Sequence, residues 1–492
     1  MKKAHHSLTM NPRVTLAFLL ALSVGAMALL SFGTKPAESL QAPAQPLYEV
    51  RDLGVLSGGS LPPYGGFSYA FGINEAGKVV GAASANFTNP EVGAEEHPFL
   101  YSDGQMQDLG TLGGPYAYAT DINDADKVVG SSTMNAEAIE RHAFLYGGGQ
   151  MQDLGTLQGY SESYATAINN NDEVVGLSSM TFQDQERAFL YSDGVMRDLG
   201  TLGGATSSAL GINEAGKAVG GAATSNGEGH AFLYSGGQMQ DLGTLGGSYS
   251  RAYDINDADK IVGSSTTRGD AEQHTFLYSG QNMQDLGTLE GYTSYSYPTA
   301  INNADQVVGQ SSDSEGTEHP FLYSDGVMRD LNSLIPADSG WELTNAQDIN
   351  DKGYIVGLGQ NFNVGNNGGE SHAFLLTPIP YFDGFYQPVD NLPTLNKTKP
   401  GKTIPIRFSL GGDEGLDIFA DGYPKSEAIP CDSTATVDGI EETVTGKGGL
   451  SYNASTGTYE YAWTTSSTSS GCRQFVMKLK DGTVHRANFI FR

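Results

Sequence analysis

Residues 119–130 read Ala-Thr-Asp-Ile-Asn-Asp-Ala-Asp-Lys-Val-Val-Gly, and residues 142–155 read His-Ala-Phe-Leu-Tyr-Gly-Gly-Gly-Gln-Met-Gln-Asp-Leu-Gly. Each stretch holds two short runs of β-branched, aromatic or other apolar residues, separated by a turn of Asn, Asp or Gly. Such runs around a short polar turn are typical of tight antiparallel hairpins. Together the two stretches predict four strands, which we call a to d in chain order.

The same unit returns seven times between residues 48 and 378, and its marks keep constant spacing. The Asn of Ile-Asn always stands 7 residues before the Gly of Val-Gly, and the Phe of Phe-Leu stands 9 residues before the Asp of Asp-Leu. Units of four strands and about 45 residues match the blades of a β-propeller. The sequence therefore predicts an all-β chain with a seven-bladed β-propeller at residues 48–380.

The chain enters the repeat out of phase. Residues 48–56 read as a strand d with no a, b or c before them, whereas the last unit, from Asn350 to Leu376, lacks a strand d. We therefore expect the N-terminal strand to complete the seventh unit and close the ring, which would remove exposed sheet edges.

The first 47 residues have the composition of an export segment and a linker. Lys2, Lys3 and Arg13 precede an apolar run at residues 14–32 that ends near Ala-Met-Ala. Residues 1–32 are predicted to be a signal peptide, or an N-terminal membrane anchor if they are not cleaved. Residues 33–47 read as a Pro-containing linker. The expected location is secreted or at the cell surface.

Composition and charge exclude several classes of function. The 492 residues include 65 glycines and carry a formal net charge of -29, which opposes binding to nucleic acid. There is no Gly-x-Ser-x-Gly, His-Glu-x-x-His, Cys-x-x-Cys or Walker sequence. We expect no cofactor and no metal site, no membrane contact apart from residues 14–32, and a monomer.

After residue 380 the period stops, and residues 381–492 are predicted to form a separate small β-sandwich. The only two cysteines of the chain, Cys431 and Cys472, fall in this part. Because an exported domain matures in an oxidising environment, we expect them to form a disulfide, the alternative being two free thiols.

Two resemblances follow from these motifs. His-Ala-Phe-Leu-Tyr at residues 142–146, with Asp-Leu-Gly-Thr-Leu-Gly-Gly, resembles the HAF family of bacterial extracellular repeats over residues 48–378. Pro405-Ile406-Arg407-Phe408, with Gly-Phe-Tyr-Gln-Pro-Val-Asp-Asn at residue 384, resembles the PxKF domain, with Arg in place of Lys. The resemblances imply secreted or surface proteins, propellers and a small sandwich, and no particular reaction.

The repeated polar residues are interpreted as structural. Six histidines share one repeat position at the start of strand c, and seven aspartates precede Leu on strand d. A catalytic group is not needed seven times, so we expect these aspartates to fix the turn into the next blade. We expect a structural role for the histidines, such as a hydrogen bond to an adjacent blade. The Asp-Ile-Asn-Asp-Ala-Asp segments at Asp121 and Asp254 could suggest calcium, but an Asx-rich hairpin turn is the preferred interpretation.

The loops point to a binding surface. All length variation falls in the b-to-c and d-to-a loops, which share one face of a propeller, here called the variable face. The longest loops are residues 57–68, 83–96, 333–344 and 358–371. The d-to-a loops also carry aromatic residues suited to sugars or peptides, and the predicted ligand-binding residues are Tyr64, Phe67, Tyr116, Tyr118, Tyr160, Tyr164, Tyr249, Tyr292, Tyr295 and Trp341.

The functional hypothesis from the sequence is an exported, noncatalytic binding or scaffold protein, whose variable face holds a glycan, a polymer or a protein partner at a surface. The alternative is a propeller-type glycoside hydrolase or lyase, which would need a pair of nonrepeated carboxylates. The candidates for that pair are Glu91, Glu95, Glu96, Glu137 and Glu342. A structural component of the cell envelope is a third possibility.

Overall fold

The computed structural model describes residues 47–56, 66–85, 95–136, 140–180, 185–292, 295–312, 316–364, 369–379, 382, 384–411, 415–431, 434–440, 442–444, 449–453, 456–480 and 483–492. The predicted signal segment, nearly all of the linker, Tyr64, Glu91 and Glu137 lie outside these residues. The chain divides into two compact units, Met1–Thr377 and Pro378–Arg492. The described residues form strands, turns and one short 3-10 helix, η1 (Leu331–Ser333), with no α-helix among them.

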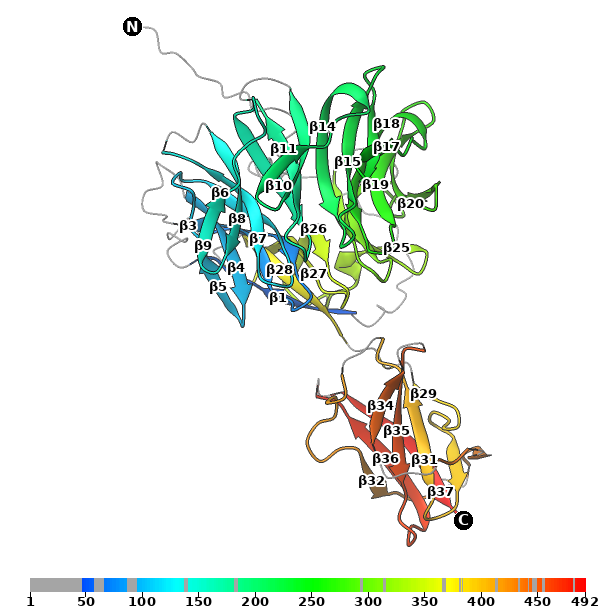
Figure 1. Ribbon diagram of the computed structural model, residues 1–492. Coiled ribbons are helices and arrows are strands. Elements are labelled where there is room, and N and C mark those ends of the chain that lie inside the picture. Colours follow the sequence, from blue (N-terminus) through cyan, green and yellow to red (C-terminus); the bar gives the residue numbers. More distant parts are fainter. Residues whose placement is uncertain are drawn as a thin grey trace, which may run out of the picture. The chain divides into compact units, whose positions relative to one another are not determined.

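The first compact unit consists of four-stranded antiparallel sheets, each of which corresponds to one sequence repeat (Figure 1). We number these repeat units one to seven. Unit one is β2 (Ser68–Ile73), β3 (Val79–Ala85), β4 (Glu95–Ser102) and β5 (Gln105–Asp108). Unit two is β6 (Ala117–Ile122), β7 (Val128–Thr133), β8 (Arg141–Gly147) and β9 (Gln150–Asp153). Unit three is β10 (Glu162–Ile168), β11 (Val174–Ser179), β12 (Glu186–Ser192) and β13 (Val195–Asp198).

The remaining units follow the same order. Unit four is β14 (Gly203–Ile212), β15 (Ala218–Thr224), β16 (Gly229–Ser235) and β17 (Gln238–Asp241). Unit five is β18 (Gly246–Ile255), β19 (Ile261–Thr267), β20 (Gln273–Ser279) and β21 (Asn282–Gly287). Unit six is β22 (Tyr295–Ile301), β23 (Val307–Ser312), β24 (Glu318–Ser324) and β25 (Val327–Asp330), and a single bridge between Gln273 and Tyr295 joins units five and six.

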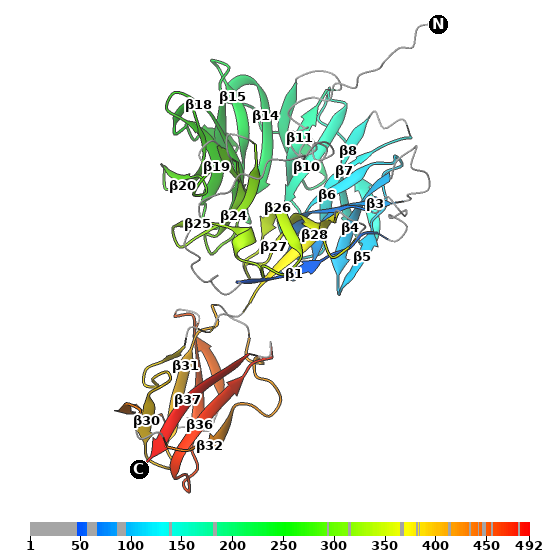
Figure 2. The same ribbon diagram turned by 180° about the vertical axis from the view of Figure 1, so that it is seen from behind.

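Unit seven takes its fourth strand from the other end of the chain. Its sheet has the order β1-β28-β27-β26, where β1 is Tyr48–Asp52, β26 is Trp341–Ile349, β27 is Ile355–Asn361 and β28 is Glu370–Pro378. Figures 1 and 2 both show the blue β1 beside the yellow β27 and β28. The N-terminal strand is thus the outer strand of the sheet formed by the last repeat.

Close packing explains two regular marks of the repeat, the Phe of strand c and the Gly of strand b. The Phe on each strand c is completely buried, from Phe99 in unit one to Phe374 in unit seven. The glycine of Val-Gly must be small, because a Cβ at Gly130 would lie 2.0 Å from the Tyr118 carbonyl oxygen and 2.9 Å from the Phe144 ring. Each fully buried aromatic side chain contributes about 1.5 to 3 kcal/mol from burial before entropy is subtracted.

The second compact unit contains two sheets of short strands. One has the order β29 (Phe385–Tyr386), β31 (Thr403–Phe408), β35 (Thr458–Thr464) and β34 (Leu450–Asn453). The other has the order β32 (Lys425–Ala428), β36 (Gly471–Lys478), β37 (Val484–Phe491), β30 (Leu395–Thr398) and β33 (Val437–Gly439). A common core that includes Phe408, Tyr459, Phe475 and Phe489 draws on both sheets.

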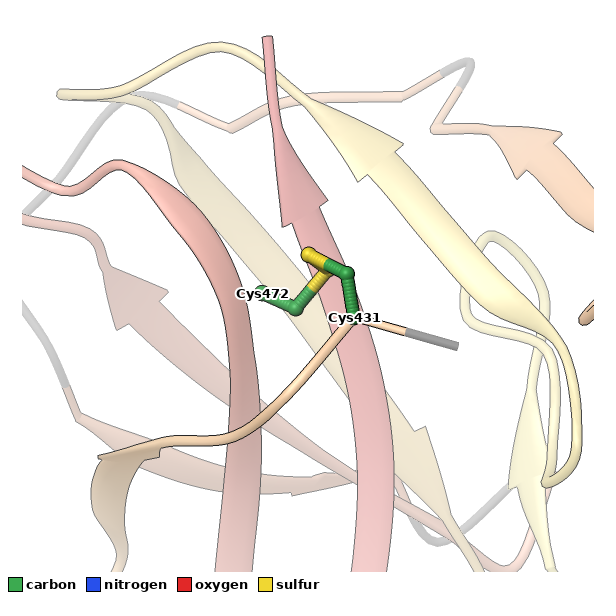
Figure 3. The surroundings of a disulfide bond; sticks show 2 residues. All are labelled: Cys431 and Cys472. Carbon is green, nitrogen blue, oxygen red and sulfur yellow. A yellow bond between two sulfur atoms is a disulfide. The ribbon is translucent and has the colours of Figure 1, made fainter. Parts of the chain in front are cut away.

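The predicted disulfide is present. Cys431 follows β32 and bonds to Cys472 on β36, across 41 residues of sequence (Figure 3). In the chain-entropy model a loop of this length contributes about 4 kcal/mol of stability.

Candidate functional site

Repeated side chains join the units at the a-to-b turns, which lie at the opposite ends of the strands from the variable face. In every unit the buried Asn of Ile-Asn donates its side-chain Nδ2–H to the backbone oxygen of the corresponding Asn in the next unit. Asn350 of unit seven donates to the oxygen of Asn74 in unit one, 3.0 Å away. Within each turn the Asn Oδ1 accepts two backbone N–H groups, as it does at Ala125 and Lys127 from Asn123. The Asx-turn interpretation of these segments is confirmed.

The repeated His and Asp residues form pairs within one sheet. Nδ1 of His142 lies 2.9 Å from the Asp153 carboxylate, and the same carboxylate accepts the Gly155 N–H. The prediction that the Asp fixes a turn is confirmed. The hydrogen bond of the His is made within its own sheet and not, as in the example expected from the sequence, to an adjacent unit, because strands c and d are neighbours in the same sheet. In unit seven the partner of His372 is Asp52 of β1, 320 residues away.

Three carboxylates occupy a single repeat position on the innermost strands, where the other four units have Gly or Ala. Asp121, Asp254 and Asp348 each accept the N–H of the following Ile and one N–H from the next unit. Burial raises the pKa of all three, to about 7 for Asp254 and to about 6 for Asp348. The charge of Asp348 raises the pKa of Asp254 further, while the N–H donors lower it.

A cavity of about 530 Å³ opens on the variable face among units three, four and five. Hydroxyls, glycines, one aromatic ring and three charged side chains surround it. The lining residues are Glu186, Thr206, Ser207, Ser208, Gly221, Ala222, Ala223, Gly227, Glu228, Gly229, Ser248, Tyr249, Ser250 and Arg251. A volume of this size lies in the range of small-ligand sites.

At one position beside the cavity, unit four has a smaller residue than the other units have. Ser208 on β14 pairs with Gly221 on β15. The same repeat position as Ser208 carries a Tyr in units one, two, three and six, for example Tyr118 and Tyr164. Unit four therefore has no phenol ring at this position, and Ser208 lines the cavity.

Arg251 holds the equivalent position in unit five and borders this space. A Cβ at Gly221 would lie 3.2 Å from Cγ of Arg251, so the arginine stem crosses the glycine. Nη2 of Arg251 donates to the Ser208 hydroxyl oxygen at 3.0 Å. Its Nε is buried and has no hydrogen-bond partner among the described residues. The protein therefore satisfies only part of the donor set of this guanidinium.

Two carboxylates also line the cavity. Glu186 of unit three is only 9% exposed, and its charge acts on Arg251. Glu228 accepts a hydrogen bond from the side chain of Asn226 at 2.7 Å. The ring of Tyr249 lies over Gly229, where a Cβ would be 3.1 Å from the ring. The wall thus offers hydrogen-bond donors, acceptors and one aromatic surface.

The predicted ligand-binding aromatic residues lie in different surroundings in the structure. Tyr249 lines the cavity. Tyr160, Tyr292 and Trp341 pack against cores between sheets, and Tyr118 lies under the Arg141 guanidinium at 5.1 Å. Four more have other surroundings: Phe67 contacts Tyr69, Tyr164 bonds to Glu162, Tyr295 contacts Tyr297, and Tyr116 is 38% exposed.

Of the acids proposed for catalysis, the structure describes Glu95, Glu96 and Glu342, and none of these three lines the cavity. Glu95 lies 3.6 Å from the His97 ring, burial raises the pKa of Glu96, and Glu342 is exposed on β26. Sequence reasoning missed Glu186, Ser208, Gly221 and Arg251. A partial signal was available, because Ser208 and Arg251 stand at a strand-a position where units one, two, three and six carry Tyr.

The described part of the chain has neither a membrane-spanning helix nor a cluster of metal-binding side chains. Within it, no helix has the length and apolar character needed to cross a membrane. No group of three or more His, Cys, Asp or Glu side chains there has an arrangement that could hold a metal ion.

One family model and several solved structures are similar to parts of the chain. Residues 203–348 match the family model described as a protein of unknown function, DUF3466. No curated protein matches the chain. The β-propeller domain of the Trilobed protease from Pyrococcus furiosus is 11% identical, with 63% of this chain and 95% of that chain covered and a TM-score of 0.44.

Two further solved structures are similar at the same level. An acylaminoacyl peptidase from Pyrococcus horikoshii is 12% identical, with 72% of this chain and 59% of that chain covered and a TM-score of 0.41. TolB from Acinetobacter baumannii is 12% identical, with 62% and 84% covered and a TM-score of 0.31. The chain is all-β, contains repeated four-stranded sheets and has propeller-like neighbours.

Proposed function

We propose that the chain is an exported, noncatalytic binding protein whose variable face holds a glycan. The cavity beside Tyr249 and Arg251 is the observation that carries the proposal. An aromatic ring with hydroxyls and a charged donor offers both the apolar area and the hydrogen bonds that sugars use. A polymer or a protein at a surface would occupy the same face.

The architecture behind this proposal is a closed seven-bladed propeller of HAF-type repeats, followed by a PxKF-like sandwich. The bond from Asn350 to the Asn74 oxygen supports closure, as does the place of β1 in the sheet of unit seven. A ring held in this way is a stiff support for a site built between units.

Export is the expected location of the protein, and the Cys431–Cys472 disulfide supports it because such bonds persist in oxidising compartments. Residues 381–492 would then act as an accessory attachment module. Cleaved secretion and anchoring through residues 14–32 are distinguished by N-terminal sequencing of the exported protein.

The test is retention of the chain from residue 33 onward on insoluble polysaccharides and cell-wall fractions, with soluble products measured in parallel. We expect retention without product release, weakened by Tyr249→Ala. Tyr116→Ala is the matched control, because this exposed tyrosine does not line the cavity. Absence of retention on every material would contradict glycan binding and favour the structural role.

The second candidate is a glycoside hydrolase or lyase, which Glu186 and Glu228 in the cavity wall favour. Two carboxyl groups about 5 to 10 Å apart across a glycosidic bond are the usual catalytic pair. Soluble products that disappear in both Glu186→Gln and Glu228→Gln would establish this activity in place of binding alone.

A further inference from the structure

The charged side chains of the cavity in units three to five favour uncharged sugars over acidic ones. Its charged lining residues are one arginine and two glutamates, Glu186 and Glu228. The whole chain carries a formal net charge of -29, which also disfavours the approach of anions. A ligand with a carboxylate or sulfate would meet repulsion from both sources.

We infer that the occupant is an uncharged pyranose unit of a neutral glycan, recognised by Arg251, Ser208 and Tyr249. This inference rests on the proposed glycan-binding function and names its substrate class and subsite. An uncharged sugar brings hydroxyl and ring oxygens as acceptors without adding negative charge. Arg251 then serves as a hydrogen-bond donor rather than as the partner of an anion.

The donor set of Arg251 is incomplete in the protein alone. Nη2 bonds to a neutral hydroxyl, on Ser208, and Nε has no partner among the described residues. A buried polar group without a partner is costly, so an occupant that brings oxygen acceptors to this guanidinium is favoured. The arginine stem packs across Gly221, where a Cβ would lie 3.2 Å from its Cγ, and the Tyr249 side chain also hydrogen-bonds to the guanidinium.

The serines beside the arginine do not all have this role. The Ser207 hydroxyl accepts the Ala188 N–H and donates to the Gly200 oxygen, and the Ser250 hydroxyl makes the same pair of bonds to Ala231 and Gly243. These two side chains hold neighbouring units together. Ser208 is the serine whose hydroxyl contacts the guanidinium, and recognition is therefore assigned to it.

Restoring the repeat residue in unit four tests the inference. Ser208→Tyr places in the cavity the side chain that four other units carry at this position. The matched control is Asn345→Tyr, which introduces the same residue, tyrosine, at the same repeat position of unit seven. Arg251→Gln is the second cavity variant, since it removes the charged donor with little change of size. Circular dichroism and thermal unfolding verify that each variant is folded.

The probes are soluble hexasaccharides of neutral hexoses and N-acetylhexosamines, with oligogalacturonate as the charged comparison. Each is titrated calorimetrically into the chain from residue 33 onward, and retention on the parent polysaccharides is measured beside it. We expect a neutral probe to bind, with affinity at least about ten-fold lower in Ser208→Tyr and Arg251→Gln and unchanged in Asn345→Tyr.

The outcomes separate this inference from the proposed function. Retention that both cavity variants leave intact would place the glycan elsewhere and overturn the cavity assignment alone. Preference for oligogalacturonate over every neutral probe would overturn the uncharged class. Absence of retention and of binding by wild type would overturn the glycan-binding function and this inference together.

Discussion

At the scale of single residues, one buried side chain can organise two units. Asn169 is 2% exposed, and its Nδ2 donates to the Asn213 oxygen of the next unit at 3.1 Å. Its Oδ1 accepts the N–H groups of Asn171 and Glu173. Removing this amide leaves the buried Asn213 oxygen and two part-buried backbone N–H donors without this partner.

We expect Asn169→Ala to lower the free energy of unfolding by about 2 to 4 kcal/mol, because unsatisfied buried groups cost more than the bond itself is worth. Urea denaturation measures the change. Asn170→Ala is the control, since Asn170 is exposed and its bonds to Asp124 lie at the surface. Equal losses in the two variants would show that burial of the amide is not what matters.

The inner carboxylates make stability depend on pH. Burial raises the pKa of Asp254 to about 7, above its ordinary value of 3.8. The folded protein therefore holds this proton more tightly than the unfolded chain does. The resulting stabilisation is complete below the unfolded pKa and is lost as pH rises through about 7.

Urea denaturation of the wild type between about pH 5 and pH 8 should thus show falling stability as pH increases, in line with this linkage. Asp254→Asn, which cannot titrate, should reduce the slope. The slope that remains is expected from Asp121 and Asp348, because burial raises the pKa of both carboxyl groups, to about 6 for Asp348. A slope unchanged in Asp254→Asn would contradict the raised pKa.

At the scale of elements, β1 is the strand whose partner is most distant in sequence. Asp52 bonds to His372, to the Asn361 side chain and to the Gly54 N–H. Without β1, strand β28 would present an unpaired edge, which is a template for association with other chains.

We therefore expect deletion of residues 1–56 to lower the thermal midpoint and to produce oligomers, whereas deletion of residues 1–46 leaves β1 in place and should do neither. Size-exclusion chromatography and thermal unfolding of the two truncated chains make the comparison. Asp52→Ala should show a smaller loss in the same direction. A monomeric chain of unchanged stability after removal of β1 would contradict its role as an outer strand.

The strands themselves could be predicted from the sequence, whereas the cavity could not. Each hairpin is local, so the spacing from Phe144 to Asp153 determines a pairing that the structure reproduces. The cavity depends on a residue being small: Ser208 matters because Tyr118 and Tyr164 occupy the same position elsewhere. The hydrogen bonds from the Asn side chain of each unit to the next unit were also not predicted. Their acceptors are backbone oxygens, which no residue type in the sequence indicates.

At the scale of the whole molecule, 56 acidic and 27 basic side chains give the net charge of -29. Like charges on one compact chain repel one another and oppose folding. Dissolved salt screens this repulsion, since the Debye length falls from about 30 Å at 0.01 M to about 8 Å at 0.15 M.

Added salt should therefore raise the thermal midpoint of the protein. It should leave the affinity for a neutral glycan unchanged. We expect the thermal midpoint to increase as NaCl rises from about 0.01 M to about 0.5 M, because the charges responsible are mostly exposed and widely spaced. Retention on a neutral polysaccharide releases no counterions, so it should stay constant over the same range. Retention that weakens steeply with salt would indicate that ionic attraction drives binding, and a basic surface rather than the cavity would then have to be the site of contact.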